Sequence, residues 1–316
     1  MIFRFIRAAF AAALFSFLSP SVVYGGEISV LSYNLWNYFV EGDYSKRVKP
    51  VDSRDAVAAA IAKSGADIVL VSEIGGANSM DDLKRRLSEH GAEYPFSTFM
   101  HGSDLTRALG VFAKFAPVEV QKLDPAYLLR PKKAPKSSKP NRVPVQRGFL
   151  HLVFERDGYR LHIVLAHLKS RIYHSVYSHS DMRRYEARLL RGVVSDILKK
   201  DPAANILVAG DFNDTKDSGA IAAIRGDTLK ESMKLVDLRP LDADGCCWTH
   251  WWKREDSYGR IDYAFASPKL LPEIEKDKNR IVQMPFSWLK ASDHRPIEVF
   301  IDTDLEKTQA KKPVSH

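Results

Sequence analysis

The chain has 316 residues and a formal net charge of +8, a basic balance that is compatible with a polyanionic partner. Its length allows one large domain or two small ones, and no linker or internal repeat divides it. Its two cysteines, Cys246 and Cys247, are adjacent, and because neighbouring cysteines bridge each other only with strain, a disulfide scaffold is excluded.

Residues 1–25 have the layout of a secretory signal peptide. Arg4 and Arg7 precede an apolar run over 8–18, and small residues follow up to Gly25. The run is too short to span a bilayer comfortably, so a cleaved signal is favoured over a membrane anchor. Cleavage removes two arginines and no acid, which lowers the formal charge from +8 to +6. We expect an exported monomer, periplasmic or secreted, with no stable membrane insertion, one domain over 26–303 and a disordered tail over 304–316.

The first half of the domain alternates predicted strands and helices. In chain order these are strand 28–33, helix 54–63, strand 67–72, helix 79–90 and short strands near 96–101, 108–113 and 118–123. The two buried strands end immediately before Asn34 and Glu73. Asp52 or Ser53 is expected to cap the first helix, and Gly65 is expected to end it.

A run rich in proline and lysine, residues 130–142, has no apolar period and predicts an exposed loop. A hairpin follows, with strands 148–154 and 159–166 joined through an Asp-Gly turn. Its second strand leads directly into His167 and Lys169.

Residues 181–200 predict the longest helix, because apolar side chains recur along one stripe. Arg184, Arg188 and Arg191 follow another face of this helix at helical spacing. We interpret that face as solvated, with substrate contact as the alternative.

Residues 205–214 predict a buried strand that runs out into a polar loop carrying Asp211 and Asn213. In extended backbone these two side chains project to the same side, where they can hold a hard cation, orient a water or bind a phosphate oxygen. An Asx-turn is the alternative interpretation. Further on, strand 260–265 carries Asp262, and Asp293 and His294 precede strand 297–301.

Polar residues thus recur where predicted strands end, and each alone has an ordinary explanation, such as a surface acid or a satisfied core histidine. Corresponding strand ends of one sheet or sandwich meet in a single cleft. There the carboxylates and imidazoles would repel and desolvate one another without a cation or a charged substrate. Oxygen ligands without a zinc pattern favour Mg²⁺, with Mn²⁺ or Ca²⁺ as alternatives, and such an ion beside two histidines suits phosphoester cleavage.

The motifs resemble those of the endonuclease/exonuclease/phosphatase superfamily, in the same order over about residues 27–301. The matching stretches are Ser-Tyr-Asn34, Ser-Glu73, Ala-His167, Gly-Asp211-Phe-Asn213, Arg-Ile-Asp262-Tyr and Ser-Asp293-His294. The resemblance implies an α/β fold, a four-layer α/β sandwich in which two mixed β-sheets pack face to face with helices on the outside. It also implies that Glu73 binds Mg²⁺, together with Asn34 and Asp293.

The same resemblance implies a catalytic role for His294 as general base or phosphate-polarising group, oriented by Asp262. Asp211 and Asn213 would position the attacking water and a phosphate oxygen, and the choice of base between His294 and Asp211 stays open. His167 would donate to the phosphate or the leaving oxygen. The remaining predicted substrate contacts are Arg147 and Lys169.

Departures from the family pattern bear on the substrate. Trp36 and His167 stand where the abasic-site repair branch has Asp and Tyr, which argues against DNA repair. We expect an exported Mg²⁺-dependent phosphodiesterase, with DNA or RNA as the favoured substrate. The alternatives are a phosphomonoesterase, a sphingomyelinase-like phospholipid phosphodiesterase, and a catalytically silent protein that only binds polyanions.

Overall fold

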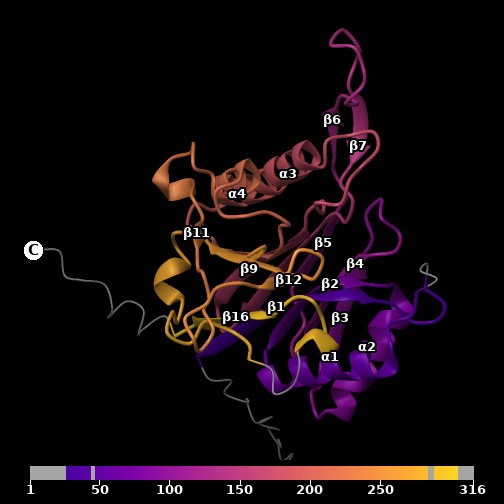
Figure 1. Ribbon diagram of the computed structural model, residues 1–316. Helices are drawn as coiled ribbons and strands as arrows, with labels where there is room; N and C mark the ends of the chain where they lie inside the picture. The colour runs from indigo at the N-terminus through magenta and orange to yellow at the C-terminus, as the bar shows by residue number, and fades with distance from the viewer. Residues whose placement is uncertain (1–25, 44–46, 284–287, 305–316) are drawn as a thin grey trace, which may run out of the picture.

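The computed structural model describes residues 26–43, 47–283 and 288–304 (Figure 1). The predicted signal peptide and residues 305–316 of the predicted tail lie outside the described residues. Within the described ranges, no helix combines the length and the apolar character needed to cross a bilayer.

Two mixed six-stranded sheets form the centre of the molecule. The first has the order β15 (Arg280–Ile281), β16 (Ile297–Asp302), β1 (Glu27–Tyr38), β2 (Ile68–Ile74), β4 (Ala108–Ala113) and β3 (Phe96–Met100). The second has the order β11 (Val236–Asp237), β14 (Asp262–Ala266), β10 (Asn205–Asp211), β9 (Tyr159–His167), β8 (Phe149–Arg156) and β5 (Glu119–Leu123). In each sheet a central parallel pair, β1 with β2 or β9 with β10, is flanked by antiparallel strands.

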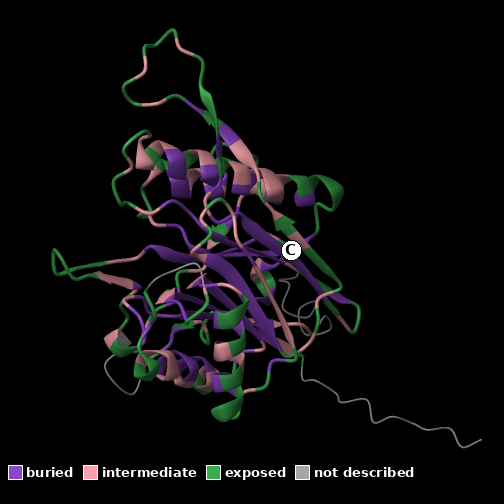
Figure 2. Cartoon of the chain, turned by 90° about the vertical axis from the view of Figure 1, so that its right-hand side faces the viewer, coloured by how far each residue is buried: buried purple, intermediate pink, exposed green. Residues whose placement is uncertain are grey.

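Helices cover the outer face of each sheet, so that the buried strands lie between two helical layers (Figures 1 and 2). They are α1 (Val51–Ser64) and α2 (Ala77–Glu89) on the first sheet, and α3 (His179–Lys200) and α4 (Gly219–Arg225) on the second. The predicted four-layer α/β sandwich is therefore confirmed.

Strand β10 shows why these strands are continuous apolar runs in the sequence. Leu207 and Ala209 pack in the core between the two sheets, while Ile206 and Val208 pack against the helices of the second sheet. Because both faces of the strand are covered, polar residues are excluded until the strand ends.

The start of α1 differs from the prediction. Pro50 occupies the N-cap position, and no side chain caps this helix, so neither Asp52 nor Ser53 has the predicted role. The backbone N–H of Arg54 bonds the Pro50 carbonyl oxygen, and the fixed φ of proline already suits entry into a helix. At the other end Gly65 adopts a φ of 68°, and this predicted stop is confirmed.

The Pro- and Lys-rich run is largely exposed, as predicted, but its last two residues belong to a strand. Strands β6 (Ala126–Leu129) and β7 (Asn141–Pro144) pair as an antiparallel hairpin that projects from the body of the molecule (Figures 1 and 2). A second small hairpin consists of β12 (His250–Trp252) and β13 (Ser257–Gly259). The 3₁₀ turns are η1 (Glu231–Met233), η2 (Leu271–Glu273) and η3 (Trp288–Lys290).

The arginine face predicted on α3 is only partly correct. Arg184 and Arg188 are exposed, whereas Arg191 is buried and its guanidinium donates to the carbonyl oxygens of Ile224 and Met233. The short helix α4, which the sequence analysis did not predict, packs along this side of α3 and removes Arg191 from solvent.

Candidate active site

Strands from both sheets bring the predicted polar residues to one end of the sandwich. His167 and Asp211 are the last residues of β9 and β10, and Asp262 is the first residue of the antiparallel strand β14. Asp211 is paired in register with His167 on one side and with Asp262 on the other. The sheet itself therefore places two carboxylates and an imidazole next to one another.

His294 and Asp262 form a buried pair, in which Nδ1 of the ring lies 2.8 Å from the Asp262 carboxylate. Burial disfavours the charged ring, but the negative charges of Asp262, Asp211 and Asp293 outweigh it and raise the pKa of His294 to about 10. The second ring nitrogen, Nε2, lies 3.9 Å from the Asp211 carboxylate. The His294 ring is therefore positively charged and lies within 4 Å of the carboxylates of Asp211, Asp262 and Asp293.

Asp211 is fixed by amide donors. Asn34 donates from Nδ2 to one carboxylate oxygen at 2.9 Å, and the backbone N–H of Asn213 donates to the other at 2.8 Å. Burial, followed by the charge of Asp262, raises the pKa of Asp211 to about 7. His167 lies behind it, with Nε2 at 3.4 Å from the carboxylate.

The chain is not extended at Asn213, and of the two interpretations that the sequence left open the Asx-turn is the one confirmed. Asn213 adopts a φ of 53°, and its N–H bond to Asp211 is an Asx-turn. This turn bends the Asn213 side chain back, so that Nδ2 lies 3.2 Å from the Asp211 carboxylate. The Asx-turn between Asp211 and Asn213 therefore also forms part of the polar cluster at the end of β10.

Glu73 reaches the site through a backbone irregularity in β2. Its φ is 59°, and the register with β4 shifts between Ser72 and Ile74, which is the signature of a β-bulge. The carboxylate accepts the Asn37 N–H at 3.1 Å and lies 3.9 Å from Nε2 of His167. Strained backbone of this kind concentrates at functional sites.

Basic side chains lie beside the acids. Arg147 is buried and lies 3.4 Å from the Asp104 carboxylate, while its Nε has no hydrogen-bond partner among the described residues. Lys169 is also buried, and its backbone N–H donates to Glu186 at 2.6 Å. Burial and the charge of Arg147 lower the pKa of Lys169 to about 8.

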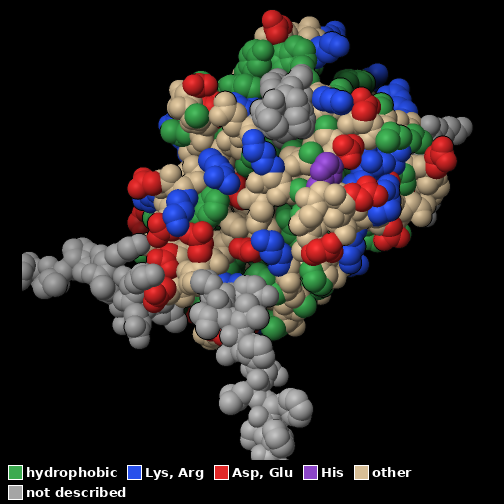
Figure 3. Space-filling view, turned by 90° about the horizontal axis from the view of Figure 1, so that it is seen from below, with side chains coloured by type: hydrophobic (Ala, Val, Ile, Leu, Met, Phe, Trp, Pro, Cys, Tyr) green, Lys and Arg blue, Asp and Glu red, His purple; other side chains and the backbone are tan. Residues whose placement is uncertain are grey.

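A cleft of about 1000 Å³ opens above these groups. Of the predicted residues, those that line it are Glu73, Arg147, Lys169, Asp211, Asn213, Asp293 and His294. Asn34, His167 and Asp262 are buried beneath. On the face of the molecule seen in Figure 3, acidic and basic side chains are mixed, and no large patch of one charge is visible.

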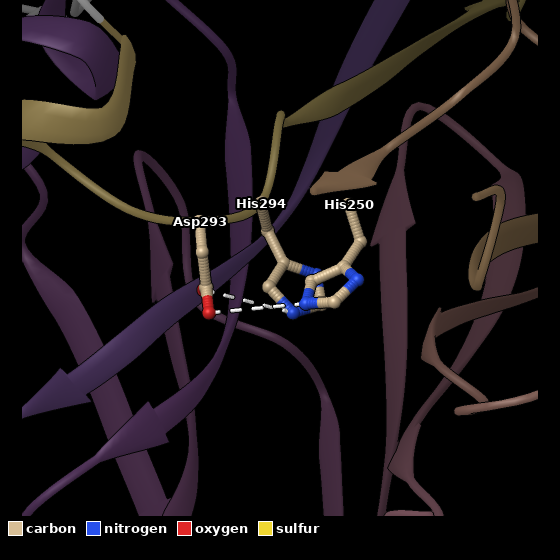
Figure 4. Close-up of side chains that lie close together, drawn as sticks. All are labelled: His250, Asp293 and His294. Atoms are coloured by element: carbon tan, nitrogen blue, oxygen red, sulfur yellow. Dashed lines mark ion pairs between the residues drawn. The ribbon is translucent and has the colours of Figure 1, made fainter. Parts of the chain in front are cut away.

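Sequence reasoning missed several lining residues. Arg107 lies 3.8 Å from the Glu73 carboxylate, and the Trp252 and Tyr258 side chains at the cleft are partly exposed. His250 in β12 is the most informative omission, because its ring centroid lies 4.6 Å from that of His294 (Figure 4). The strand that carries it has three residues, too few to show a period. The Thr-His-Trp sequence within the Trp-rich stretch was the available signal.

The donor set suits a divalent cation. Asp293 has one buried carboxylate oxygen without a hydrogen-bond partner among the described residues, and burial, together with the charge of Glu73, raises its pKa to about 6. Two groups of three side chains offer ligand atoms within 4.8 Å of one another, Asp211 with Asp262 and His294, and His250 with Asp293 and His294. Both groups combine carboxylate oxygens with imidazole nitrogens, and the carboxylate oxygens are the donors that hard cations prefer.

Solved structures with the same fold are numerous. The catalytic domain of human nocturnin is 17% identical with a TM-score of 0.57, over 88% of this chain and 94% of that domain. Sphingomyelinase C from Streptomyces griseocarneus is 17% identical with a TM-score of 0.55, over 87% and 99%. An endonuclease/exonuclease/phosphatase family protein from Bacteroides thetaiotaomicron is 18% identical with a TM-score of 0.56, over 89% and 96%.

No curated protein sequence matches the chain significantly. The model of the Endonuclease/Exonuclease/phosphatase family, in contrast, matches residues 31–294, which include every predicted site residue. Because this match spans most of the chain, the protein belongs to the Endonuclease/Exonuclease/phosphatase family, whose members hydrolyse phosphoester bonds.

Proposed function

We propose that the protein is an exported, Mg²⁺-dependent phosphodiesterase that cleaves nucleic acid. The observation that carries the proposal is one cleft that combines a buried acid–imidazole cluster at its base, basic side chains on its wall and aromatic side chains at its surface. The first feature suits phosphoester hydrolysis, and the other two suit a polyanion with stackable bases.

We assign the role of general base to Asp211, a choice that the sequence left open. Its pKa of about 7 makes it a carboxylate that both accepts and releases a proton near neutral pH. Asn34 and Asn213 hold both of its oxygens in place. His294 keeps its proton because its pKa is raised to about 10, so it acts as a fixed positive charge facing the phosphate.

His167 is assigned to a neutral hydrogen-bond role. Burial, reinforced by the charge of Arg147, lowers its pKa well below the ordinary value. Neither ring nitrogen has a hydrogen-bond partner among the described residues. A neutral ring in this place, beneath the cleft, has one N–H to donate towards the Asp211 carboxylate, 3.4 Å from Nε2. Arg147, Lys169 and Asn213 line the cleft and bind oxygens of the substrate there.

Glu73 and Asp293 are the residues that would hold Mg²⁺, with Mn²⁺ or Ca²⁺ as substitutes. Asn34 belongs to the same region, although its amide oxygen already accepts the Trp36 N–H at 3.0 Å. A bound divalent ion neutralises phosphate charge and lowers the pKa of a water.

Nucleic acid is favoured over other phosphodiesters because aromatic residues line the cleft. Trp36, Trp252, Tyr258 and Tyr173 are 43%, 40%, 57% and 72% exposed, respectively, and all four line it. Base–aromatic stacking stabilises single-stranded nucleic acid by about 1–3 kcal/mol per base. A small phosphomonoester has no row of bases to stack on these rings.

The test is degradation of single-stranded DNA, single-stranded RNA and duplex DNA by the purified protein, with and without EDTA. We expect Mg²⁺-dependent cleavage that weakens steeply with salt, because phosphate contacts release counterions. Release of inorganic phosphate from small esters without cleavage of any polynucleotide would overturn the nuclease proposal. Binding that survives chelation without cleavage would support the polyanion-binding alternative instead.

A phospholipid phosphodiesterase is the second candidate. Ile172 is 74% exposed beside Tyr173 in the loop that follows the His167 strand, and exposed apolar side chains next to a phosphate site suit a lipid surface. A structural neighbour is described as a sphingomyelinase C. Mg²⁺-dependent hydrolysis of sphingomyelin vesicles, with oligonucleotides left intact, would select this candidate.

Export rests on the sequence of residues 1–25 alone. The test is the N-terminus of the protein recovered from fractionated host cells, measured by mass spectrometry. We expect a chain that begins near Gly26 and is found outside the cytoplasm. An intact Met1 in the cytoplasmic fraction would contradict this.

A further inference from the structure

We propose that the projecting hairpin of β6 and β7 is a second nucleic-acid-binding surface, which holds the phosphate backbone of a strand after that strand leaves the cleft. The hairpin and its loop, residues 126–144, form what we call the basic arm. The proposal rests on the proposed function in taking a polynucleotide as the substrate. It goes beyond that function because no residue of the basic arm lines the cleft.

Positive charge is concentrated at the outer end of the basic arm. The stretch from Arg130 to Arg142 has six basic side chains and no acidic one. All six are exposed, namely Arg130, Lys132, Lys133, Lys136, Lys139 and Arg142. Like charges on one short projection repel one another, and a bound polyanion relieves that repulsion. The basic arm is therefore suited to a chain of phosphates.

This charge is not balanced by the protein. Among the described residues, none of the six bases forms an ion pair with an acid. Exposed bases elsewhere do form such pairs: Arg160 lies 2.9 Å from Glu155, and Lys199 lies 3.0 Å from Asp196. The six charges of the basic arm thus remain available to a ligand.

The loop at the outer end has a defined shape. The Ala134 N–H donates to the Pro131 carbonyl oxygen at 3.1 Å, and the next turn repeats this pattern, with the Ser138 N–H on the Pro135 carbonyl oxygen at 3.0 Å. Nε of Arg130 donates to the Ser138 carbonyl oxygen at 3.0 Å and so closes the loop. Proline restricts the free backbone, and a preorganised surface loses less conformational entropy when it binds.

The basic arm continues directly into the wall of the cleft. Strand β7 ends at Pro144 and is followed by Gln146 and Arg147, both of which line the cleft. On the other side, Nζ of Lys132 lies 4.2 Å from the ring centroid of Tyr173, which also lines the cleft. A polynucleotide that leaves the cleft past Tyr173 therefore meets the basic arm.

Contacts at its base keep the basic arm in this position. The Tyr127 ring stacks on that of Tyr185 in α3, with centroids 5.5 Å apart. Nδ2 of Asn141 donates to the Tyr177 hydroxyl at 2.9 Å. These contacts fasten β6 to α3 and β7 to the segment between β9 and α3, so that the charged end projects from an anchored base (Figures 1 and 2).

The composition of the basic arm favours nucleic acid over a membrane. From Arg130 to Arg142 the only apolar side chains are those of Ala134 and the prolines. Segments that bind in a membrane interface bury large side chains such as Trp, Phe or Leu beside their basic residues, and this stretch has none. Contacts of Lys and Arg with phosphates need no apolar surface.

The test is binding of fluorescein-labelled oligothymidylates to the full-length protein, measured by fluorescence polarisation in EDTA so that no strand is cleaved. One oligothymidylate has about 4 nucleotides and the other about 16, the two ends of the range that one single-strand-binding domain covers. A cleft of about 1000 Å³ has room for only a few nucleotides, so only the longer strand extends onto the basic arm.

Two triple variants with the same change in net charge are compared. The arm variant carries Lys133→Gln, Lys136→Gln and Lys139→Gln. The control variant carries Lys63→Gln, Lys230→Gln and Lys276→Gln, at exposed lysines outside the basic arm and the cleft. Because all six side chains are exposed, neither variant should change the midpoint of thermal unfolding.

We expect the arm variant to bind the longer strand at least about tenfold more weakly than the wild type, and the control variant to bind it within about twofold of the wild type. The shorter strand should bind equally to all three proteins. The slope of log affinity against log salt for the longer strand should become shallower by about 2 in the arm variant, because each phosphate contact with a single strand contributes about 0.7.

Equal affinity of the wild type and the arm variant for the longer strand would overturn the proposal, as would an equal loss in the control variant or an equal loss for both strands. An arm variant that binds oligothymidylate normally but no longer binds vesicles containing phosphatidylserine would also overturn it, because the basic arm would then serve a membrane surface.

Cleavage is measured separately in Mg²⁺. Arm-dependent binding without cleavage would reject the proposed function alone. Mg²⁺-dependent cleavage together with binding that is independent of the basic arm would reject the role of the arm alone.

Discussion

Asp82 in α2 and Asp211 in β10 are both shielded from water, yet their surroundings shift their pKa values in opposite directions. Asp82 accepts hydrogen bonds from the Tyr38 hydroxyl at 2.8 Å and from Arg86 at 3.0 Å, and forms an ion pair with Arg54 at 2.9 Å. Burial alone would raise its pKa, but these donors lower it to about 2. This cluster is complete without any ligand.

Asp211 also has amide donors, but burial, followed by the charge of the neighbouring acid Asp262, raises its pKa to about 7. Among the described residues, the one positively charged side chain paired with Asp211 and Asp262 is His294, so one negative charge of these two carboxylates remains to be balanced from outside. A partly buried acid with its own cations, such as Asp82, maintains the fold, whereas a buried acid among other acids, such as Asp211, marks a place for a cation and a substrate.

The largest expected effect is on turnover. Asp211→Asn should reduce the Mg²⁺-dependent rate by about 10²–10⁴-fold, because an amide cannot accept the proton of the attacking water. Without Mg²⁺ the same variant should be at least as stable as wild type at pH 8. A raised folded-state pKa means that ionisation destabilises the fold as pH rises from about 4 through 7. Steady-state kinetics and thermal unfolding measure both, and full activity in the folded variant would reject the role of Asp211.

A smaller effect is expected at the metal position. Glu73→Gln should raise the Mg²⁺ concentration needed for half-maximal rate by about 10–100-fold, because it replaces a charged ligand with a neutral one. The measurement is rate against Mg²⁺ concentration at fixed substrate. Glu93→Gln, a surface acid outside the cleft, serves as the control, and an unchanged Mg²⁺ dependence in Glu73→Gln would remove Glu73 from the metal site.

The pH–rate profile should be bell-shaped. The rate should rise through about pH 7, where Asp211 loses its proton and becomes a base, and it should rise tenfold per pH unit below that point. It should begin to fall above about pH 8, where Lys169 loses its positive charge, and fall further through about pH 10, where His294 loses its own. If the rate measured in Mg²⁺ falls as the pH rises through 7, Asp211 does not act as the general base.

The smallest expected effect on activity comes from the other acid. Asp82→Asn should leave turnover nearly unchanged and lower the free energy of unfolding by about 2 kcal/mol, because charge-assisted hydrogen bonds are lost. The folded-state pKa of Asp82 is depressed, so its contribution is present above pH 4 and disappears as pH falls towards 2. Urea unfolding at pH 7 and at pH 3 measures the free energy of unfolding at each pH. A large loss of activity in a variant of normal stability would contradict the assignment of Asp82 to the fold alone.

Much of the site was predictable because buried strands exclude polar residues until they end. Asn34, His167 and Asp211 come directly after apolar runs, and these runs are required because both faces of each sheet are covered. The pairing of Asp262 with His294 was predicted from the family resemblance. These positions are encoded locally, in strand periods and short motifs.

The remainder depends on tertiary structure. His250 lies in a three-residue strand that exists only through its pairing partners, and the bulge that turns Glu73 into the cleft leaves no pattern in the sequence. Arg191 was misread because α4, the helix that buries it, is too short to show a clear period. The sequence left extended backbone and an Asx-turn both open at Asn213, because an Asx-turn needs only the residues that a strand end also carries, and the structure has the turn.

The most direct test of the central claim is cleavage of a single-stranded oligonucleotide by chelator-treated wild type and Asp211→Asn, followed across a Mg²⁺ titration. The account predicts no cleavage by either protein without a divalent ion, restoration by Mg²⁺ in the wild type, and a rate lower by at least about 100-fold in the variant at every Mg²⁺ concentration. Cleavage by the wild type that is indifferent to chelation, or equal restoration in both proteins, would contradict it.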